Sequence, residues 1–185
     1  MTTLLTILTI LTSFLTNLET KTLQSDFVAT VSEEINAPIN YPGTIVMNGR
    51  QFRLEMFGIE AAYDGRTLYM YSGETDELTL TNPTEQELAE TNPLLYAKAL
   101  VEVCNVTERE SGEQTVITLT PKDQSIGINR FVLKVRTADL MPLSIEIKEG
   151  NKTSTLKMKE PKFITQKQEY KIVPEEDTYI NDMRF

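Results

Sequence analysis

Polar and apolar residues alternate along most of this chain, in short runs that are separated by residues typical of tight turns. Asn48-Gly49 interrupts the run from 43 to 56, and Asp64-Gly65 interrupts the run from 62 to 71. These pairs favour two-residue hairpin turns, because Asn, Asp and Gly tolerate the positive φ angles that such turns require. The pattern predicts two β-hairpins, each with one apolar face and one charged face.

A two-residue turn also determines which residues lie opposite each other across a hairpin. At Asn48-Gly49 it places Ile45 opposite Phe52 and Gly43 opposite Leu54. Ile45, Phe52 and Leu54 then share the apolar face, which continues along the strand.

The second hairpin leaves a choice of interior face. Alternation puts Leu68 and Met70 on one side and Tyr69 and Tyr71 on the other. Both sides are largely apolar, and we assign Leu68 and Met70 to the interior.

The same alternation returns in the second half of the chain, where Gly150-Asn151 predicts another hairpin with Ile145 opposite Leu156. Phe131 and Leu133 fall on one face of their run. Further strands are predicted at 76–80, 115–120 and 130–136.

Two helix starts interrupt the strands. Thr84 and Glu87 have the spacing of a capping box, which predicts a short helix that turns Leu88 inward. Asn92 followed by Pro93 is typical of an N-cap and a first helical position. We expect the second helix to place Leu95 and Ala99 on one side, because residues four apart share a helix face.

The first twenty residues predict an amphipathic helix. A secretory signal would be hydrophobic all round and would follow a basic segment, yet no Lys or Arg precedes Lys21. We therefore favour a helix of the mature protein, with any export signal absent from this sequence or upstream of it. The apolar stripe consists of Leu4, Ile7, Leu8, Leu11, Phe14, Leu15 and Leu18.

These elements predict a single domain over residues 1–185 that is mainly β with some α structure. We expect one curved antiparallel sheet of roughly eight strands, partly or wholly closed. The N-terminal amphipathic helix and the central helices would cover its apolar concave face.

Composition excludes several function classes. The net charge of −9 disfavours nucleic acid, and the absence of His removes histidine acid–base and nucleophilic chemistry and the usual zinc sites. The single cysteine, Cys104, has no partner for an intramolecular disulfide and is expected to be a buried small hydrophobe. We expect no enzyme activity, metal or cofactor, and no partner among nucleic acids.

The order of several short motifs resembles the periplasmic outer-membrane lipoprotein carrier family, LolA. The motifs are the end of the first helix with the first strand at 18–27, the hairpin region 43–80, Thr91-Asn92-Pro93-Leu94-Leu95 and Leu119-Thr120-Pro121-Lys122. Asn181-Asp182-Met183-Arg184 is similar to the ending seen in the branch found in Bacteroidetes-type bacteria.

The resemblance implies a half-open β-barrel and a monomeric periplasmic carrier that holds the acyl chains of lipoproteins in its hydrophobic cavity. Such a carrier receives acylated lipoproteins from an inner-membrane lipoprotein-releasing transporter and delivers them to an outer-membrane acceptor. The same apolar faces also suit a permanently filled core, in a cell-envelope interaction module or a general lipid-binding protein. The expected cavity wall is Ile45, Phe52, Leu54, Met56, Leu68, Met70, Phe131 and Leu133, and the expected lid is Leu11, Phe14, Leu18, Leu94 and Leu95.

One departure from the family concerns the lid. Members often carry Arg-Pro just before the position of Phe52, and the Arg latches the lid through hydrogen bonds. This chain has Asn48-Gly49 there, and Arg50 is the available substitute.

Burial energetics constrain a carrier. Burying a CH₂ group contributes ~0.8 kcal/mol, so about 40 methylenes of a triacyl anchor would contribute roughly 30 kcal/mol, more than non-covalent complexes reach. A carrier that releases its cargo therefore needs an opposing cost. Displacement of the helices that cover the same apolar face when it is empty supplies one.

Overall fold

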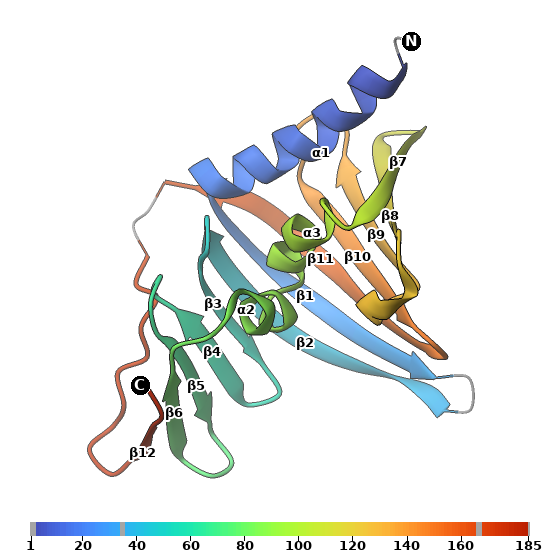
Figure 1. Cartoon of the computed structure of the whole chain (residues 1–185). Helices are drawn as coiled ribbons and strands as arrows, with labels where there is room; N and C mark the ends of the chain where they lie inside the picture. Colours follow the sequence, from blue (N-terminus) through green and yellow to red (C-terminus); the bar gives the residue numbers. More distant parts are fainter. Residues whose placement is uncertain (1–2, 34–35, 166–167, 185) are drawn as a thin grey trace.

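In the computed structural model, which describes residues 3–33, 36–165 and 168–184, one curved sheet of 12 strands wraps around a group of helices (Figure 1). The spatial order is β12-β6-β5-β4-β3-β2-β1-β11-β10-β9-β8-β7. The strands are β1 (Thr22–Glu33), β2 (Asn36–Asn48), β3 (Gln51–Met56), β4 (Ile59–Tyr63), β5 (Leu68–Ser72), β6 (Glu77–Thr81), β7 (Cys104–Ser111), β8 (Gln114–Pro121), β9 (Arg130–Arg136), β10 (Pro142–Glu149), β11 (Lys152–Ile164) and β12 (Tyr179–Asp182).

The helices lie on the concave side, between the two wings of the sheet (Figure 1). They are α1 (Thr3–Thr20), α2 (Glu85–Thr91), α3 (Pro93–Leu100) and the 3₁₀ turn η1 (Gln124–Ile126). The predicted class, a half-open barrel whose concave face is covered by helices, is confirmed. No helix in the described part of the chain is long and apolar enough to span a membrane.

The strand number is larger than expected, 12 rather than about eight, and the reason lies mainly at the sheet edges. β7 is an edge strand with only one apolar residue, Val106, beyond Cys104, and β12 has four residues. Edge strands pack on one side only, so their sequences lack strong alternation. β12 also pairs with β6 in parallel, whereas the other neighbours are antiparallel.

The predicted register of the first hairpin is wrong by two residues. The turn lies at Gly49-Arg50 rather than at Asn48-Gly49, and Gly49 has a φ angle of +57°. The Gly49 N–H donates to the Leu18 carbonyl at the end of α1, 2.7 Å away, a tertiary contact that no local pattern reports. A shift of two residues keeps every side chain on its predicted face. The observed pairs are Gly43 with Met56, Ile45 with Leu54, and Met47 with Phe52.

The second hairpin has a four-residue loop, 64–67, instead of the predicted two-residue turn. The Asp64 carboxylate accepts hydrogen bonds from the N–H groups of Arg66 and Thr67, at 2.9 and 2.8 Å, and closes the loop. These bonds satisfy the backbone of a wider loop, as Asp side chains do in turns. A further two-residue turn at Phe57-Gly58, which is absent from the sequence-based predictions, joins β3 to β4.

The Gly150-Asn151 turn and the pairing of Ile145 with Leu156 are confirmed. The two helix caps are also confirmed. Thr84 and Glu87 form a complete capping box at the start of α2, and the Asn92 side chain accepts from the Leu94 N–H with Pro93 at the first position of α3.

The buried face of α3 differs from the expected one. Leu94, Ala97 and Leu100 are buried, whereas Leu95 is half-buried and Ala99 is exposed. The fully buried Asn92 side chain, which also contacts the Met47 sulfur at 3.9 Å, orients α3 in this way.

The concave face carries the main hydrophobic core. The predicted apolar strand positions turn inward and meet the helix residues Leu11, Phe14 and Leu18, which confirms the described part of the helix stripe. Leu4, Ile7 and Leu8 lie outside the side chains that the structure describes. The largest fully buried members are Phe14, Phe27, Phe52, Phe131, Leu23, Ile45, Met47, Leu88, Leu94, Leu100 and Ile117.

The convex face of β4–β6 is apolar rather than charged, which corrects the expectation of one charged face per hairpin. Ala62, Leu78 and Leu80 form a second small core there with Ile172. Tyr69 packs against this core, so Leu68 and Met70 occupy the concave side, as assigned. The segment that carries Ile172 crosses this face before β12 returns to the sheet edge (Figure 1).

Candidate functional site

A groove of about 770 Å³ opens between helices α2 and α3 and the part of the concave face formed by β10 and the β8–β9 connection. A pocket of this size is in the range that holds small-molecule ligands. Its residues are Glu85, Gln86, Ala89, Glu90, Pro93, Tyr96, Ala99, Leu100, Val103, Ser125, Ile126, Gly127, Ile128, Ile147 and Glu149.

The groove continues the apolar concave surface. Ile147 lies opposite Phe131 in the β9–β10 pairing, so the two side chains share the concave face. Tyr96 of α3 packs edge-on against Phe131, with ring centroids 6.2 Å apart. Helix α3 therefore separates the buried core from the groove, and Phe131 lies at the boundary.

The groove is electrically negative. Burial, and after it the charges of Glu149 and Glu90, raise the pKa of Tyr96 above its ordinary value. Glu85, Glu90 and Glu149 are exposed on the rim. Among the described lining residues there is no Lys or Arg.

A second row of apolar side chains on the concave face crosses β11, β1, β2, β3 and β4. Pairing aligns Met158, Phe27, Gly43, Met56 and Ile59 in one row on the same side of the sheet. Met56 and Met158 are half-buried and Ile59 is 42% exposed. This row presents flexible thioether side chains at the border of the covered core.

Most residues of the expected cavity wall are not accessible in this state. Ile45, Phe52, Leu54, Leu68, Phe131 and Leu133 are buried under the helices, and only Met56 and Met70 are half-buried. The expected lid residues Leu11, Phe14, Leu18 and Leu94 pack in the same cluster, with Leu95 half-buried beside it.

Helices α1 and α3 pack closely against the sheet. A cavity of about 30 Å³ remains between α1, α3 and β2, bordered by Leu15, Leu18, Met47, Leu94 and Leu95. The side chains expected for the wall and for the lid pack against one another here, so an acyl chain would have to displace some of them to enter.

The open groove was missed by sequence reasoning. Tyr96 and Leu100 lie four residues apart on α3, and Ile147 follows Ile145 by two on β10. These spacings report a shared face, but they do not tell which end of that face a helix leaves uncovered.

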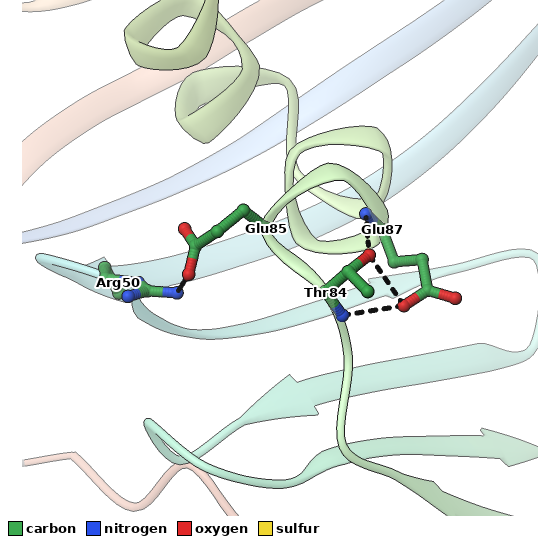
Figure 2. A network of polar contacts seen from close by, with 4 residues as sticks. All are labelled: Arg50, Thr84, Glu85 and Glu87. Atoms are coloured by element: carbon green, nitrogen blue, oxygen red, sulfur yellow. Dashed lines mark hydrogen bonds and ion pairs between the residues drawn. The ribbon is translucent and has the colours of Figure 1, made fainter.

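An exposed ion pair joins helix α2 to the turn between β2 and β3 (Figure 2). Arg50 forms an ion pair with Glu85 in the first turn of α2, next to the capping box of Thr84 and Glu87. Lys98 of α3 pairs with Glu19 at the end of α1. Arg50, which the resemblance offers in place of a latch residue, therefore contacts helix α2 directly.

Helix α1 is also attached to the edge strand β7. The Leu11 N–H donates to Oε1 of Glu108 at 3.1 Å. Partial burial raises the pKa of the Glu108 carboxyl, and the bond from Leu11 opposes that shift.

In residues 3–33, 36–165 and 168–184 no group of three or more Cys, Asp or Glu side chains could hold a metal ion. Cys104 is buried, as predicted, and burial raises the pKa of its thiol.

No protein-family model matches the chain, and no curated protein matches it. A solved structure of an uncharacterized conserved protein from Thermus thermophilus has a TM-score of 0.62 and 14% identity over 93% of this chain and 96% of that chain. The complex of MucA and MucB from Pseudomonas aeruginosa gives 0.52 and 16% identity, over 86% of this chain and 58% of that one. A LolA superfamily protein from Nitrosomonas europaea has a TM-score of 0.41 and 11% identity, over 84% of this chain and 94% of that chain.

At these identities the first two likenesses show the fold alone. Together with the sheet order they establish the half-open barrel with helices on its concave side. The chain spans 58% of the chain that it matches in the complex of MucA and MucB.

Proposed function

We propose that this protein binds the acyl chains of lipoproteins on its concave face and carries them through the periplasm from the inner to the outer membrane. The observation that supports this most is the continuity of the apolar concave face. It runs from the core under the helices, past Tyr96 and Ile147, into an open groove of about 770 Å³.

The filled interior fits a carrier that must release its cargo. Phe14, Leu88 and Leu94 are fully or almost fully buried against the sheet, so acyl chains that enter this space would displace them. Re-exposing such side chains costs about 1.5–3 kcal/mol each. This cost would offset part of the large burial energy of the acyl chains.

The partners are part of the proposal. Acylated lipoproteins would arrive from an inner-membrane lipoprotein-releasing transporter and leave to an outer-membrane acceptor, without covalent chemistry. The resemblance to the LolA family supports this assignment, and the ending Asn181-Asp182-Met183-Arg184 supports the Bacteroidetes-type branch.

The test is release of a triacylated lipoprotein from inner-membrane vesicles that hold the transporter. Ile147→Glu places a charge on the half-buried groove floor and is expected to abolish release. Val28→Glu is the matched control, because Val28 is half-buried on the convex face, opposite Lys157. Phe52→Glu is unsuitable, since a charge in a fully buried site would unfold the protein.

An unacylated lipoprotein should not be released by the native protein. Absence of release by folded native protein, with the transporter active, would contradict the carrier function.

A cell-envelope interaction module is the second candidate. The structure that shares this fold at a TM-score of 0.52 is a complex between two proteins, MucA and MucB. Exposed apolar residues at the β12 edge, Tyr179 and Ile180 among them, would suit a protein partner.

Leu95→Ser distinguishes the two functions. The substitution should weaken the packing of α3 without altering the buried residues of this helix. A carrier should then bind a fluorescent apolar probe more tightly, whereas an interaction module should only lose stability.

A further inference from the structure

The rim of the groove combines an apolar floor with one sign of charge. Glu85 and Glu90 of α2 and Glu149 of β10 border it on opposite sides, and the described lining includes no cation. An acyl chain lying on the floor near Ile147 would bring its polar end close to these carboxylates.

The three carboxylates do not contribute equally to the negative charge of the groove rim. Arg50 pairs with Glu85 and neutralises much of its charge. Glu90 accepts a hydrogen bond from the amide of Gln86, at 2.9 Å, and this partner brings no positive charge. Lys152 lies across from Glu149 in the β10–β11 pairing, and within the described residues no ion pair joins them.

The effect of Glu90 and Glu149 reaches into the groove. Both charges raise the pKa of Tyr96, whose ring lines the groove between them. A negative group placed beside Tyr96 would meet the same repulsion, and a positive group would be attracted, more strongly at low salt.

Building on the proposed function, we infer that the groove selects acylated peptides whose residues next to the acyl chain are basic, and discriminates against acidic ones. The apolar floor would hold the chain, and Glu90 and Glu149 would contact the Lys or Arg side chains of the peptide. A carboxylate or phosphate at that position would be repelled by both glutamates.

The experiment compares three peptides with the same palmitoyl chain and a fluorescent label, whose first residues are Lys-rich, Ser-rich or Glu-rich. Fluorescence anisotropy with the full-length protein gives each Kd, at low and at moderate salt. The Lys-rich peptide is expected to bind about five- to tenfold more tightly than the Glu-rich one at low salt, with a smaller difference at moderate salt.

The variant Glu90→Gln with Glu149→Gln should remove this preference, so that the Lys-rich and Glu-rich peptides bind with equal affinity. Glu175→Gln with Glu176→Gln makes the same change in charge on the C-terminal segment, away from the groove, and should keep the preference. The Lys-rich peptide without its palmitoyl chain should not bind measurably.

Equal affinity for the three acylated peptides, or a preference that survives in the Glu90/Glu149 variant, would overturn this inference and leave the proposed function standing. Failure of every acylated peptide to bind folded protein would overturn both. Tight binding of the unacylated Lys-rich peptide would also overturn the inference, because the glutamates would then act as a general basic-peptide site.

Discussion

Gly43 shows how a single residue permits the close packing of the concave face. A Cβ atom at this position would lie 2.4 Å from the Phe27 ring and 2.5 Å from the Glu55 carbonyl oxygen. Phe27 lies opposite Gly43 and is almost fully buried, so its ring occupies the space that a side chain would take. The glycine is required here by close approach rather than by a turn.

We therefore expect Gly43→Ala to lower the free energy of unfolding by about 1–3 kcal/mol, the usual range for overpacking. Urea denaturation followed by circular dichroism measures it. In a Phe27→Leu background the same change should cost less, since only the Glu55 carbonyl remains close. Equal costs in the two backgrounds would show that Phe27 is not the obstacle.

Glu108 is a second single-residue case, because its folded-state pKa is raised by burial. A carboxyl whose pKa is higher in the folded than in the unfolded state destabilises the protein as pH rises from the unfolded value of about 4.5 through the folded value. Glu108→Gln removes this titration and can still accept from the Leu11 N–H.

The free energies of unfolding of Glu108→Gln and the native protein should differ little at about pH 4. The difference should grow in favour of the variant as the pH rises to neutral. Thermal unfolding across this range tests the sign. A constant difference, or one that grows toward acid, would contradict the role of burial at Glu108.

At the level of elements, α2 depends on its first turn. Thr84 and Glu87 cap each other, and the bonds from Thr84 lower the pKa of Glu87. Thr84→Ala should destabilise the protein by about 1 kcal/mol, as loss of an N-cap usually does. Amide hydrogen exchange in α2 should accelerate with it, whereas Thr84→Ser, which keeps the hydroxyl, should leave exchange unchanged.

The ion pairs Arg50–Glu85 and Lys98–Glu19 connect α2, α3 and α1 to their surroundings. Exposed pairs contribute only about 0–1 kcal/mol each, so they can bias the position of a helix without locking it. If the helices form a lid, Arg50→Ala with Lys98→Ala should tighten binding of a fluorescent apolar probe about two- to fivefold.

The matched control for these pairs is Arg130→Ala, which breaks the exposed pair with Glu146 on the sheet. Its probe affinity should equal that of the native protein. Unchanged affinity in the Arg50/Lys98 variant would mean that these pairs do not hold the lid.

At the level of the whole molecule, the C-terminal strand protects one edge of the open sheet. β12 pairs with β6, and the Met183 N–H donates to the Leu80 carbonyl at 2.8 Å. Arg184 binds Asp182 and lowers its pKa to about 2. This pair therefore contributes stability above the unfolded pKa of Asp182, and the contribution is lost as pH falls toward about 2.

Deletion of residues 179–185 should leave the β6 edge unpaired and cause association through it. Light scattering after size-exclusion chromatography measures the mass. Tyr179→Ser with Ile180→Ser keeps the strand and removes apolar surface, and should stay monomeric. A monomeric deletion variant would show that β6 needs no cover.

Local sequence pattern was sufficient for much of this fold because the alternation of a strand and the stripe of a helix each depend on near neighbours. Phe52, Phe131 and Phe14 were correctly assigned to the interior, and the caps at Thr84 and Asn92 were correctly placed. A register error of two residues does not change the face of the sheet on which each side chain lies. The predicted faces were therefore correct, although the predicted pairing next to Gly49 was wrong.

Tertiary structure decided what no neighbour in the chain reports. The position of the first turn depends on a bond to Leu18, and the convex face of β4–β6 is buried only because Ile172 folds back over it. The groove exists because α2 and α3 cover one part of the concave face and stop short of Ile147. A pattern tells which side chains are apolar and share a face, but their exposure depends on segments that arrive from elsewhere in the chain.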